Sequence, residues 1–154
     1  MSEVEVGKKV ANFRLESTDG AISLSALKGK KVVLYFYPKD DTPGCTLEGQ
    51  DFRDAIRKFR ARNTVVLGVS RDSIPSHEKF RKKYKLPFDL LSDTEETLCT
   101  QFDVIKQKNM YGKKVRGIER STFLIDERGV LRREWRKVKV EGHVDEVLTA
   151  ISEL

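Results

Sequence analysis

Cys45 lies where an apolar stretch gives way, through a turn rich in proline and glycine, to a helical pattern. Residues 35–52 read YFYPKDDTPGCTLEGQDF. The first backbone N–H groups of a helix lack an intrahelical acceptor and carry a partial positive charge, which stabilises a thiolate. The thiolate is the nucleophilic form of cysteine. We therefore expect Cys45 to be a reactive nucleophile.

Thr42 lies three residues before Cys45, at the start of the expected helix. Two roles remain open for its side chain. A threonine at this place commonly caps the helix by accepting a backbone N–H bond. Its hydroxyl could also reach the sulfur, or a small ligand bound above it. The combination with Cys45 makes the second role more favourable than it is for a threonine taken alone.

Pro38, Thr42 and Cys45 match the pattern P-x-x-x-T-x-x-C. On this motif the chain resembles the peroxiredoxin family, and on the wider stretch YFYPKDDTPGCTLEG it is similar to the peroxiredoxin Q, or bacterioferritin comigratory protein, subgroup. Further segments carry the same resemblance: FRLESTDG, VVLGVSRDS, PFDLLSD and GIERSTFLID. The resemblance implies a thiol-dependent peroxidase that reduces hydrogen peroxide and organic hydroperoxides.

The resemblance assigns roles to the matching positions. It implies that Cys45 is the peroxidatic nucleophile and that Thr42 hydrogen-bonds the peroxide oxygens. It also implies that Pro38 shields the thiolate from water and that Arg120, in GIERSTF, supplies a guanidinium. Such donors are needed because negative charge develops on the leaving oxygen when a thiolate breaks an O–O bond. Glu48, one helical turn after Cys45, either orients Arg120 or favours the helix N-terminus, and we prefer the second.

The positions at which members of the subgroup carry a second, resolving cysteine are Gln50 and Arg81 in this chain. The remaining cysteine is Cys99, on an apolar helix face where free cysteine packs as a small hydrophobe. We therefore expect a one-cysteine cycle, in which an external thiol returns the Cys45 sulfenic acid to thiol. The alternative is a two-cysteine cycle with Cys99 as the resolving residue.

The expected partners are a hydroperoxide substrate and, as reductant, thioredoxin, glutaredoxin or a low-molecular-weight thiol. We expect a monomer or weak dimer. The chain contains no C-x-x-C or H-x-x-x-H spacing, so we expect neither a metal nor a cofactor. The absent C-x-x-C also argues against a dithiol oxidoreductase of the thioredoxin kind, which is the enzyme alternative.

The composition predicts one globular domain spanning residues 1–154. Hydrophobic residues make up 38% of the chain and charged residues 35%, and the apolar residues occur in periodic blocks. No apolar run reaches the roughly 18 residues of a membrane span, and the N-terminus has no apolar signal core. These features and the two cysteines predict a cytoplasmic protein without a membrane partner.

The chain carries 30 lysines and arginines against 24 acidic residues, for a net charge of +6. The basic residues are concentrated at 106–120 and 132–139. Acidic residues interrupt both stretches and no nucleic-acid-binding motif accompanies them, so we expect a solvated surface that steers anionic reductants or peroxides. An alternative that is not an enzyme is a non-catalytic thioredoxin-fold or nucleic-acid-binding module that uses this surface.

The periodicities predict an α/β chain in which a strand buried on both faces leads into the Cys45 helix, and a second strand follows at 64–69. The helix is amphipathic and continues through Phe59. The resemblance implies a thioredoxin-like fold, with a central mixed β-sheet flanked by helices on both faces. Elsewhere we expect an extended segment at 12–16, helices at 76–84, 94–102 and 144–151, strands at 88–91, 120–125 and 130–135, and a loop at 106–117.

Overall fold

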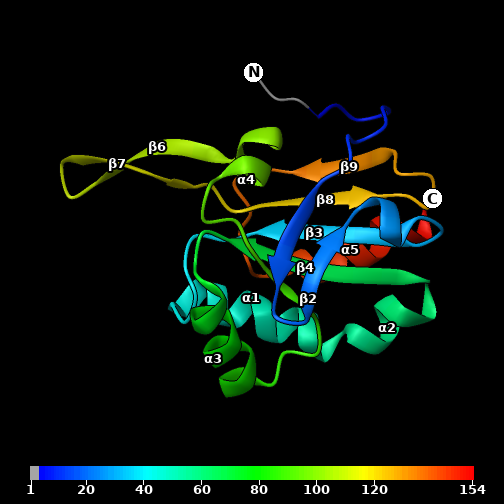
Figure 1. Cartoon of the computed structure of the whole chain (residues 1–154), viewed down its shortest axis with the longest axis horizontal. Helices are drawn as coiled ribbons and strands as arrows, with labels where there is room; N and C mark the ends of the chain where they lie inside the picture. Colours follow the sequence, from blue (N-terminus) through cyan, green and yellow to red (C-terminus); the bar gives the residue numbers. More distant parts are fainter. Residues whose placement is uncertain (1–3) are drawn as a thin grey trace.

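The computed structural model describes residues 4–154, which contain nine strands and five α-helices (Figure 1). The strands are β1 (Arg14–Ser17), β2 (Gly20–Ser23), β3 (Lys31–Phe36), β4 (Thr64–Ser70), β5 (Leu90–Ser92), β6 (Ile105–Met110), β7 (Lys113–Ile118), β8 (Ser121–Ile125) and β9 (Leu131–Trp135). The helices are α1 (Pro43–Asp54), α2 (Ile56–Ala61), α3 (Ile74–Tyr84), α4 (Thr97–Gln101) and α5 (His143–Ser152), with a short 3-10 helix at Ser25–Leu27. None of the described helices has the length and apolarity needed to cross a membrane.

Seven of the strands form a mixed sheet in the order β2-β1-β5-β4-β3-β8-β9. The central strand β3 pairs in parallel with β4 and antiparallel with β8, and β4 pairs in parallel with β5. A parallel pair needs a crossover connection, and here α1 and α2 supply it between β3 and β4. The predicted mixed α/β fold, with its βαβ unit around Cys45, is confirmed.

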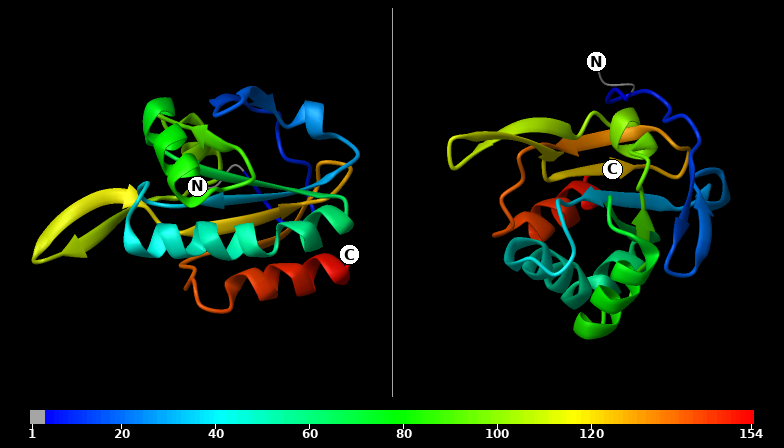
Figure 2. Two further views of the ribbon diagram at one scale, coloured as in Figure 1. Left: turned by 90° about the horizontal axis from the view of Figure 1, so that it is seen from below. Right: turned by 60° about the vertical axis from the view of Figure 1, so that its left-hand side comes forward.

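Helices cover both faces of the sheet. Tyr35 and Tyr37 belong to a hydrophobic cluster that β3 shares with α1, α2, α3 and α5. Leu34 and Phe36 belong to a second cluster, which includes α4 and the N-terminal segment. In Figure 2, α1 and α5 run side by side along one face of the sheet. A strand covered on both sides must be apolar at successive positions, which explains the almost wholly apolar sequence of β3.

The helix that carries Cys45 is interrupted once. One helix is expected from Cys45 through Phe59, but α1 ends at Asp54 and α2 begins at Ile56. The N–H of Ala55 bonds to the carbonyls of both Asp51 and Phe52, at 3.3 and 3.2 Å, so the turn tightens there. Phe52 and Phe59 are nevertheless both buried, so the predicted apolar face is kept.

The expected loop at 106–117 is wrong, because these residues form the antiparallel hairpin of β6 and β7. Two positive φ angles, 54° at Tyr111 and 77° at Gly112, turn the chain between the strands, as in a type I′ turn. Tyrosine is an uncommon residue at such an angle, and most of the strand side chains are polar and exposed. The usual hairpin signals, an Asn-Gly turn and alternating apolar residues, are therefore missing.

The helix expected at 94–102 is shorter than predicted. It begins at Thr97, because Glu96 has a left-handed φ of 62° that a continuing helix does not accommodate. Asp93 caps it, accepting the backbone N–H groups of Leu98 at 3.1 Å and Cys99 at 2.7 Å. The helices expected at 76–84 and 144–151 are confirmed.

Candidate active site

Cys45 and Arg120 meet at the carboxyl end of β3. Cys45 is the third residue of α1, which begins at Pro43. Arg120 directly precedes β8, whose Ser121 pairs with Phe36 at the end of β3. Both segments therefore reach the same end of the sheet, where Nη2 of Arg120 lies 3.5 Å from Sγ of Cys45. The cysteine is buried, with 2% of its surface exposed.

The first turn of α1 places backbone donors around Cys45. The first helical hydrogen bond runs from the N–H of Thr46 to the carbonyl of Thr42, at 2.8 Å. Pro43 has no N–H, so the groups that precede this bond belong to Gly44 and Cys45. Their partial positive charge favours an anion at the helix start, as the sequence predicts.

Glu48 holds the guanidinium of Arg120 from the opposite side. Nη1 of Arg120 donates to Oε1 of Glu48 at 2.7 Å. Glu48 is buried, and its second oxygen, Oε2, has no hydrogen-bond partner. Burial raises the pKa of Glu48 to about 7, although the charge of Arg120 opposes this shift. Of the two roles considered for Glu48, the contact supports the orientation of Arg120 rather than the preferred role at the helix N-terminus.

Gly44 makes room for Arg120. A Cβ atom at this position would lie 3.0 Å from Nη2 of Arg120, closer than ordinary van der Waals contact. The same nitrogen is the one that approaches the sulfur of Cys45. A side chain at position 44 would therefore displace the guanidinium by a few tenths of an ångström.

Thr42 and Pro38 lie in the segment that leads to Cys45, and in the described part of the chain neither side chain forms a hydrogen bond to the sulfur. Thr42 is the N-cap residue of α1, with extended backbone angles, but its side chain makes no cap bond. Its hydroxyl donates to the carbonyl of Lys39 at 2.8 Å. Pro38 is half-buried in the loop that follows β3. The hydroxyl of Thr42 would have to turn from Lys39 to donate to a bound peroxide.

A buried polar group ties the loop between β3 and α1 to α3. The carboxylate of Asp40 accepts bonds from the hydroxyls of Tyr37 at 2.6 Å and Ser76 at 2.8 Å. Nδ1 of His77 lies 2.7 Å from the same carboxylate, and Nε2 of His77 lies 2.9 Å from the carbonyl of Leu91. These contacts anchor Asp40, midway between Pro38 and Thr42, to Tyr37 and to α3.

Asp40, Asp72 and His77 are the only described residues that group as potential metal ligands. Their donor atoms already bond within the protein, however. Oδ2 of Asp72 accepts from the hydroxyl of Ser70 and from the backbone N–H of Asp40. Both ring nitrogens of His77 are engaged as well. We therefore assign this cluster a structural role.

Cys99 lies apart from Cys45. It is fully buried in the hydrophobic cluster on one face of the sheet, whereas Cys45 belongs to the cluster on the other face. Burial, together with the neighbouring carboxylate of Asp93, holds the pKa of Cys99 well above its ordinary value. A thiol of this kind is a poor nucleophile.

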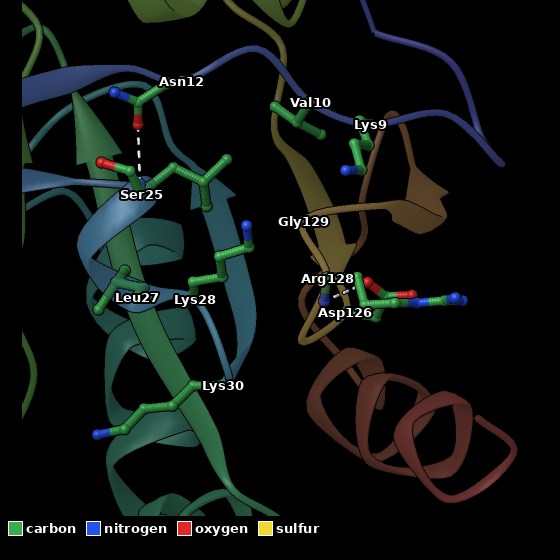
Figure 3. Close-up of a pocket in the computed structure, with 11 residues that line it drawn as sticks. Lys9, Val10, Asn12, Ser25, Leu27, Lys28, Lys30, Asp126, Arg128 and Gly129 are labelled. Carbon is green, nitrogen blue, oxygen red and sulfur yellow. Dashed lines mark hydrogen bonds between the residues drawn. The ribbon is translucent and has the colours of Figure 1, made fainter.

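A cavity of about 180 Å³ lies between the N-terminal segment, the 3-10 helix and the turn after β8 (Figure 3). Lys30 lines it and directly precedes β3, whereas Cys45 follows the other end of β3. The six residues of β3 span roughly 20 Å at about 3.3 Å per residue. This cavity is therefore separate from the candidate active site.

The chain is similar to known proteins along most of its length. Residues 6–134 match the model of the AhpC/TSA family. The chain is 56% identical over 146 residues to a putative peroxiredoxin bcp of Coxiella burnetii, covering 94% of this chain and 97% of that protein. It is 51% identical over 152 residues to peroxiredoxin Bcp of Bacillus subtilis, covering 98% and 97%.

Solved structures show the same fold. A cysteine-to-serine mutant of Xylella fastidiosa PrxQ matches with a TM-score of 0.93 and 43% identity, over 99% of this chain and 98% of that one. A peroxiredoxin Q of Xanthomonas campestris matches with a TM-score of 0.87 and 51% identity, over 92% and 90%. The fold and the site together define a thioredoxin-fold, thiol-dependent peroxidase. Within that class, the chain belongs to the AhpC/TSA family, in its peroxiredoxin Q/Bcp subgroup.

Two features of the site were missed from the sequence. The contact of Asp40 with His77 joins residues on separate elements, and neither residue stands in a motif with a characteristic spacing. Gly44 stands in the turn rich in proline and glycine before Cys45, but its closeness to Arg120 depends on a residue far along the chain. The TPG turn was the only available signal for Gly44.

Proposed function

We propose that Cys45 reduces hydroperoxides in a one-cysteine cycle, with Arg120, Thr42 and Pro38 completing the catalytic site. The Cys45 thiolate attacks one peroxide oxygen and the O–O bond breaks. The second oxygen leaves as water or an alcohol once it has taken up a proton, and Cys45 becomes a sulfenic acid. Arg120 stabilises the negative charge that develops on the oxygens, since its Nη2 already points at the sulfur.

The observation that carries this proposal is the 3.5 Å contact between Nη2 of Arg120 and Sγ of Cys45. The substrates are hydrogen peroxide and organic hydroperoxides. The bacterioferritin comigratory protein of Xanthomonas campestris, whose solved structure is similar to this chain, has alkyl peroxide reduction activity. That activity supports the same class of substrate for this chain.

The separation of the two cysteines supports the one-cysteine cycle. A disulfide requires Cα atoms within about 7 Å of one another, and the sheet lies between Cys45 and Cys99. Gln50 in α1 and Arg81 in α3 offer no thiol. The reductant is therefore external: thioredoxin, glutaredoxin or a low-molecular-weight thiol. We further propose that the chain acts as one domain, as a monomer or weak dimer, in the cytoplasm, which supplies reduced thiols.

Hydroperoxide consumption with dithiothreitol tests this function. Wild-type protein and Cys99→Ser should consume peroxide at similar rates, whereas Cys45→Ser should lose activity. Equal slow consumption by wild type and Cys45→Ser would refute the peroxidase assignment. Peptide mass mapping of peroxide-treated wild type should yield no Cys45–Cys99 disulfide, and a stoichiometric bridge would establish the two-cysteine alternative.

A further inference from the structure

The β6–β7 hairpin, residues 105–118, stands out from the body of the molecule; we call it the basic hairpin. Its two strands form a separate two-stranded sheet and pair with each other alone among the described strands. Figures 1 and 2 show it projecting from the end of the molecule at which the β3–α1 loop and the start of α1 lie. The basic hairpin therefore lies at the same end of the molecule as Cys45.

The basic hairpin carries charge of one sign only. Residues 105–118 read IKQKNMYGKKVRGI, with five basic residues and no acidic one. Lys106 and Arg116 form ion pairs with acidic residues of the body. Lys113 and Lys114, next to the turn, have no acidic partner within residues 4–154. The outer half of the hairpin thus presents uncompensated positive charge to the solvent.

Exposed apolar side chains accompany this charge. Tyr111 is 99% exposed at the turn, and Met110 and Val115 are 49% and 42% exposed beside it. Leu47, two residues after Cys45, is also 49% exposed. These four account for most of the large hydrophobic side chains exposed in the described part of the chain. Aromatic and apolar side chains inside a charged rim are typical of the centre of a protein–protein interface.

The base of the basic hairpin is continuous with the catalytic residues. Arg120 follows β7 after a single intervening residue. The ammonium of Lys108 donates to the carbonyl of Ile118, and burial together with the charge of Arg120 lowers the pKa of Lys108. Glu96, which precedes α4, bonds to both Arg71 and Arg116 and so anchors β7 to the body. The base is fixed to the body, while the exposed tip extends outward.

We propose that the basic hairpin is the docking surface for a protein thiol reductant whose surface around its own thiol is acidic and partly apolar. This inference rests on the proposed one-cysteine cycle, in which a second thiol must reach a buried Cys45. The positive tip would attract an acidic partner. Leu47 would contact apolar groups beside the partner's thiol, and Tyr111 would contact apolar groups elsewhere on the partner. A low-molecular-weight thiol needs no such surface.

The docked reductant returns the Cys45 sulfenic acid to the thiolate in two steps. One partner thiol attacks the sulfur of the Cys45 sulfenic acid, an S–S bond forms, and the hydroxyl leaves as water. A second thiol of the partner then attacks the partner's sulfur in this mixed disulfide. Cys45 is released as a thiolate, and the partner carries away the disulfide and with it the oxidising equivalents.

Kinetics with an acidic bacterial thioredoxin, recycled by thioredoxin reductase and NADPH, test the proposal. The double variant Lys113→Glu/Lys114→Glu should lower kcat/KM for thioredoxin about tenfold or more at low salt, through slower association. The matched control is Lys28→Glu/Lys30→Glu, which changes the net charge by the same amount. These two lysines line the cavity at the end of β3 opposite Cys45. Turnover with dithiothreitol should be unchanged in both double variants. Tyr111→Ser should also lower turnover with thioredoxin while leaving turnover with dithiothreitol unchanged.

Other outcomes would refute either the docking surface or the proposed peroxidase. Unchanged thioredoxin kinetics in the hairpin variant, or an equal loss in the control variant, would overturn the docking surface. So would tight binding of single-stranded DNA by wild type that the hairpin variant loses, since the surface would then serve a nucleic acid. Failure of the wild type to consume peroxide with dithiothreitol would refute the proposed peroxidase itself, and is distinguishable because that assay involves no docking.

Discussion

Arg120 and Glu48 form an ion pair 2.7 Å long in the interior, where the carboxylate is 1% exposed. A buried ion pair costs desolvation energy, and it is retained where geometry or function needs it. Here the pair aims one guanidinium nitrogen at the carboxylate and the other at Cys45. The carboxylate therefore acts as the positioning group for the candidate catalytic arginine.

Replacing Glu48 should change how stability depends on pH. Burial raises the pKa of Glu48 from 4.5 to about 7, so the folded state binds this proton more tightly than the unfolded state. The free energy of unfolding should therefore fall as pH rises from about 4.5 to about 7, by on the order of a few kcal/mol for this group. In Glu48→Gln the fall should be shallower. Denaturant unfolding at several pH values measures the free energy of unfolding in both proteins. An equal dependence on pH in wild type and Glu48→Gln would contradict the raised pKa of Glu48.

Arg120→Lys should slow the reaction of Cys45 with peroxide. Lysine keeps the charge but loses the planar fork that reaches Glu48 and the sulfur together. We expect the second-order rate constant to fall about 100-fold, a typical loss for one donor to a developing oxyanion. Stopped-flow fluorescence of Trp135 or competition with a peroxide probe measures this rate. Arg132→Lys, on the half-exposed pair with Asp126, is the control and should react normally.

Gly44→Ala should slow the peroxide reaction without lowering the stability of the protein. Its Cβ would stand 3.0 Å from Nη2 of Arg120 and push that nitrogen away from Cys45. We expect about a tenfold slower peroxide reaction, for roughly 1.4 kcal/mol lost in the transition state. Alanine is also a better helix former than glycine, so the melting temperature should not fall. Gly49→Ala, in the same helix but facing Leu86, should leave the peroxide rate unchanged.

Asp40→Asn should destabilise the protein and loosen the loop before α1. The amide would replace one acceptor oxygen with a donor NH₂, which would face either the hydroxyl of Tyr37 or the hydroxyl of Ser76 and the ring of His77. Disrupting a buried polar network of this kind costs about 3 kcal/mol. Thermal unfolding measures the loss, and the peroxide rate should fall at temperatures where the variant is still folded. Asp41→Asn, on the exposed neighbour, should have little effect on either, and equal effects would argue against a specific role for Asp40.

The sequence predicts the elements that have strong periodicity. Residues 64–69 and 144–151 are found as predicted, because the strand is apolar throughout and the helix has a clear apolar face. The basic hairpin was missed, since its fold depends on two left-handed residues and on strand pairing rather than on burial. The interruption at Ala55 was also missed, because Phe52 and Phe59 keep one apolar face across it.

The candidate site was predictable only in part for a related reason. Cys45 could be found locally, as a cysteine at a strand-to-helix turn, but Arg120 required the resemblance to a family. The contact between them depends on the antiparallel pairing of β3 with β8, which no local pattern reveals. The Asp40–His77 contact likewise depends on where α3 packs.

The position of Cys99 across the sheet affects how readily peroxide inactivates the protein. A Cys45 sulfenic acid would have no thiol on its side of the sheet, so it would persist until an external thiol arrives. During that wait a second peroxide molecule competes for the same sulfur and would oxidise it to the sulfinic acid, which ordinary thiols do not reverse. The ratio of reductant to peroxide around the molecule would then decide how many turnovers it completes before it is inactivated.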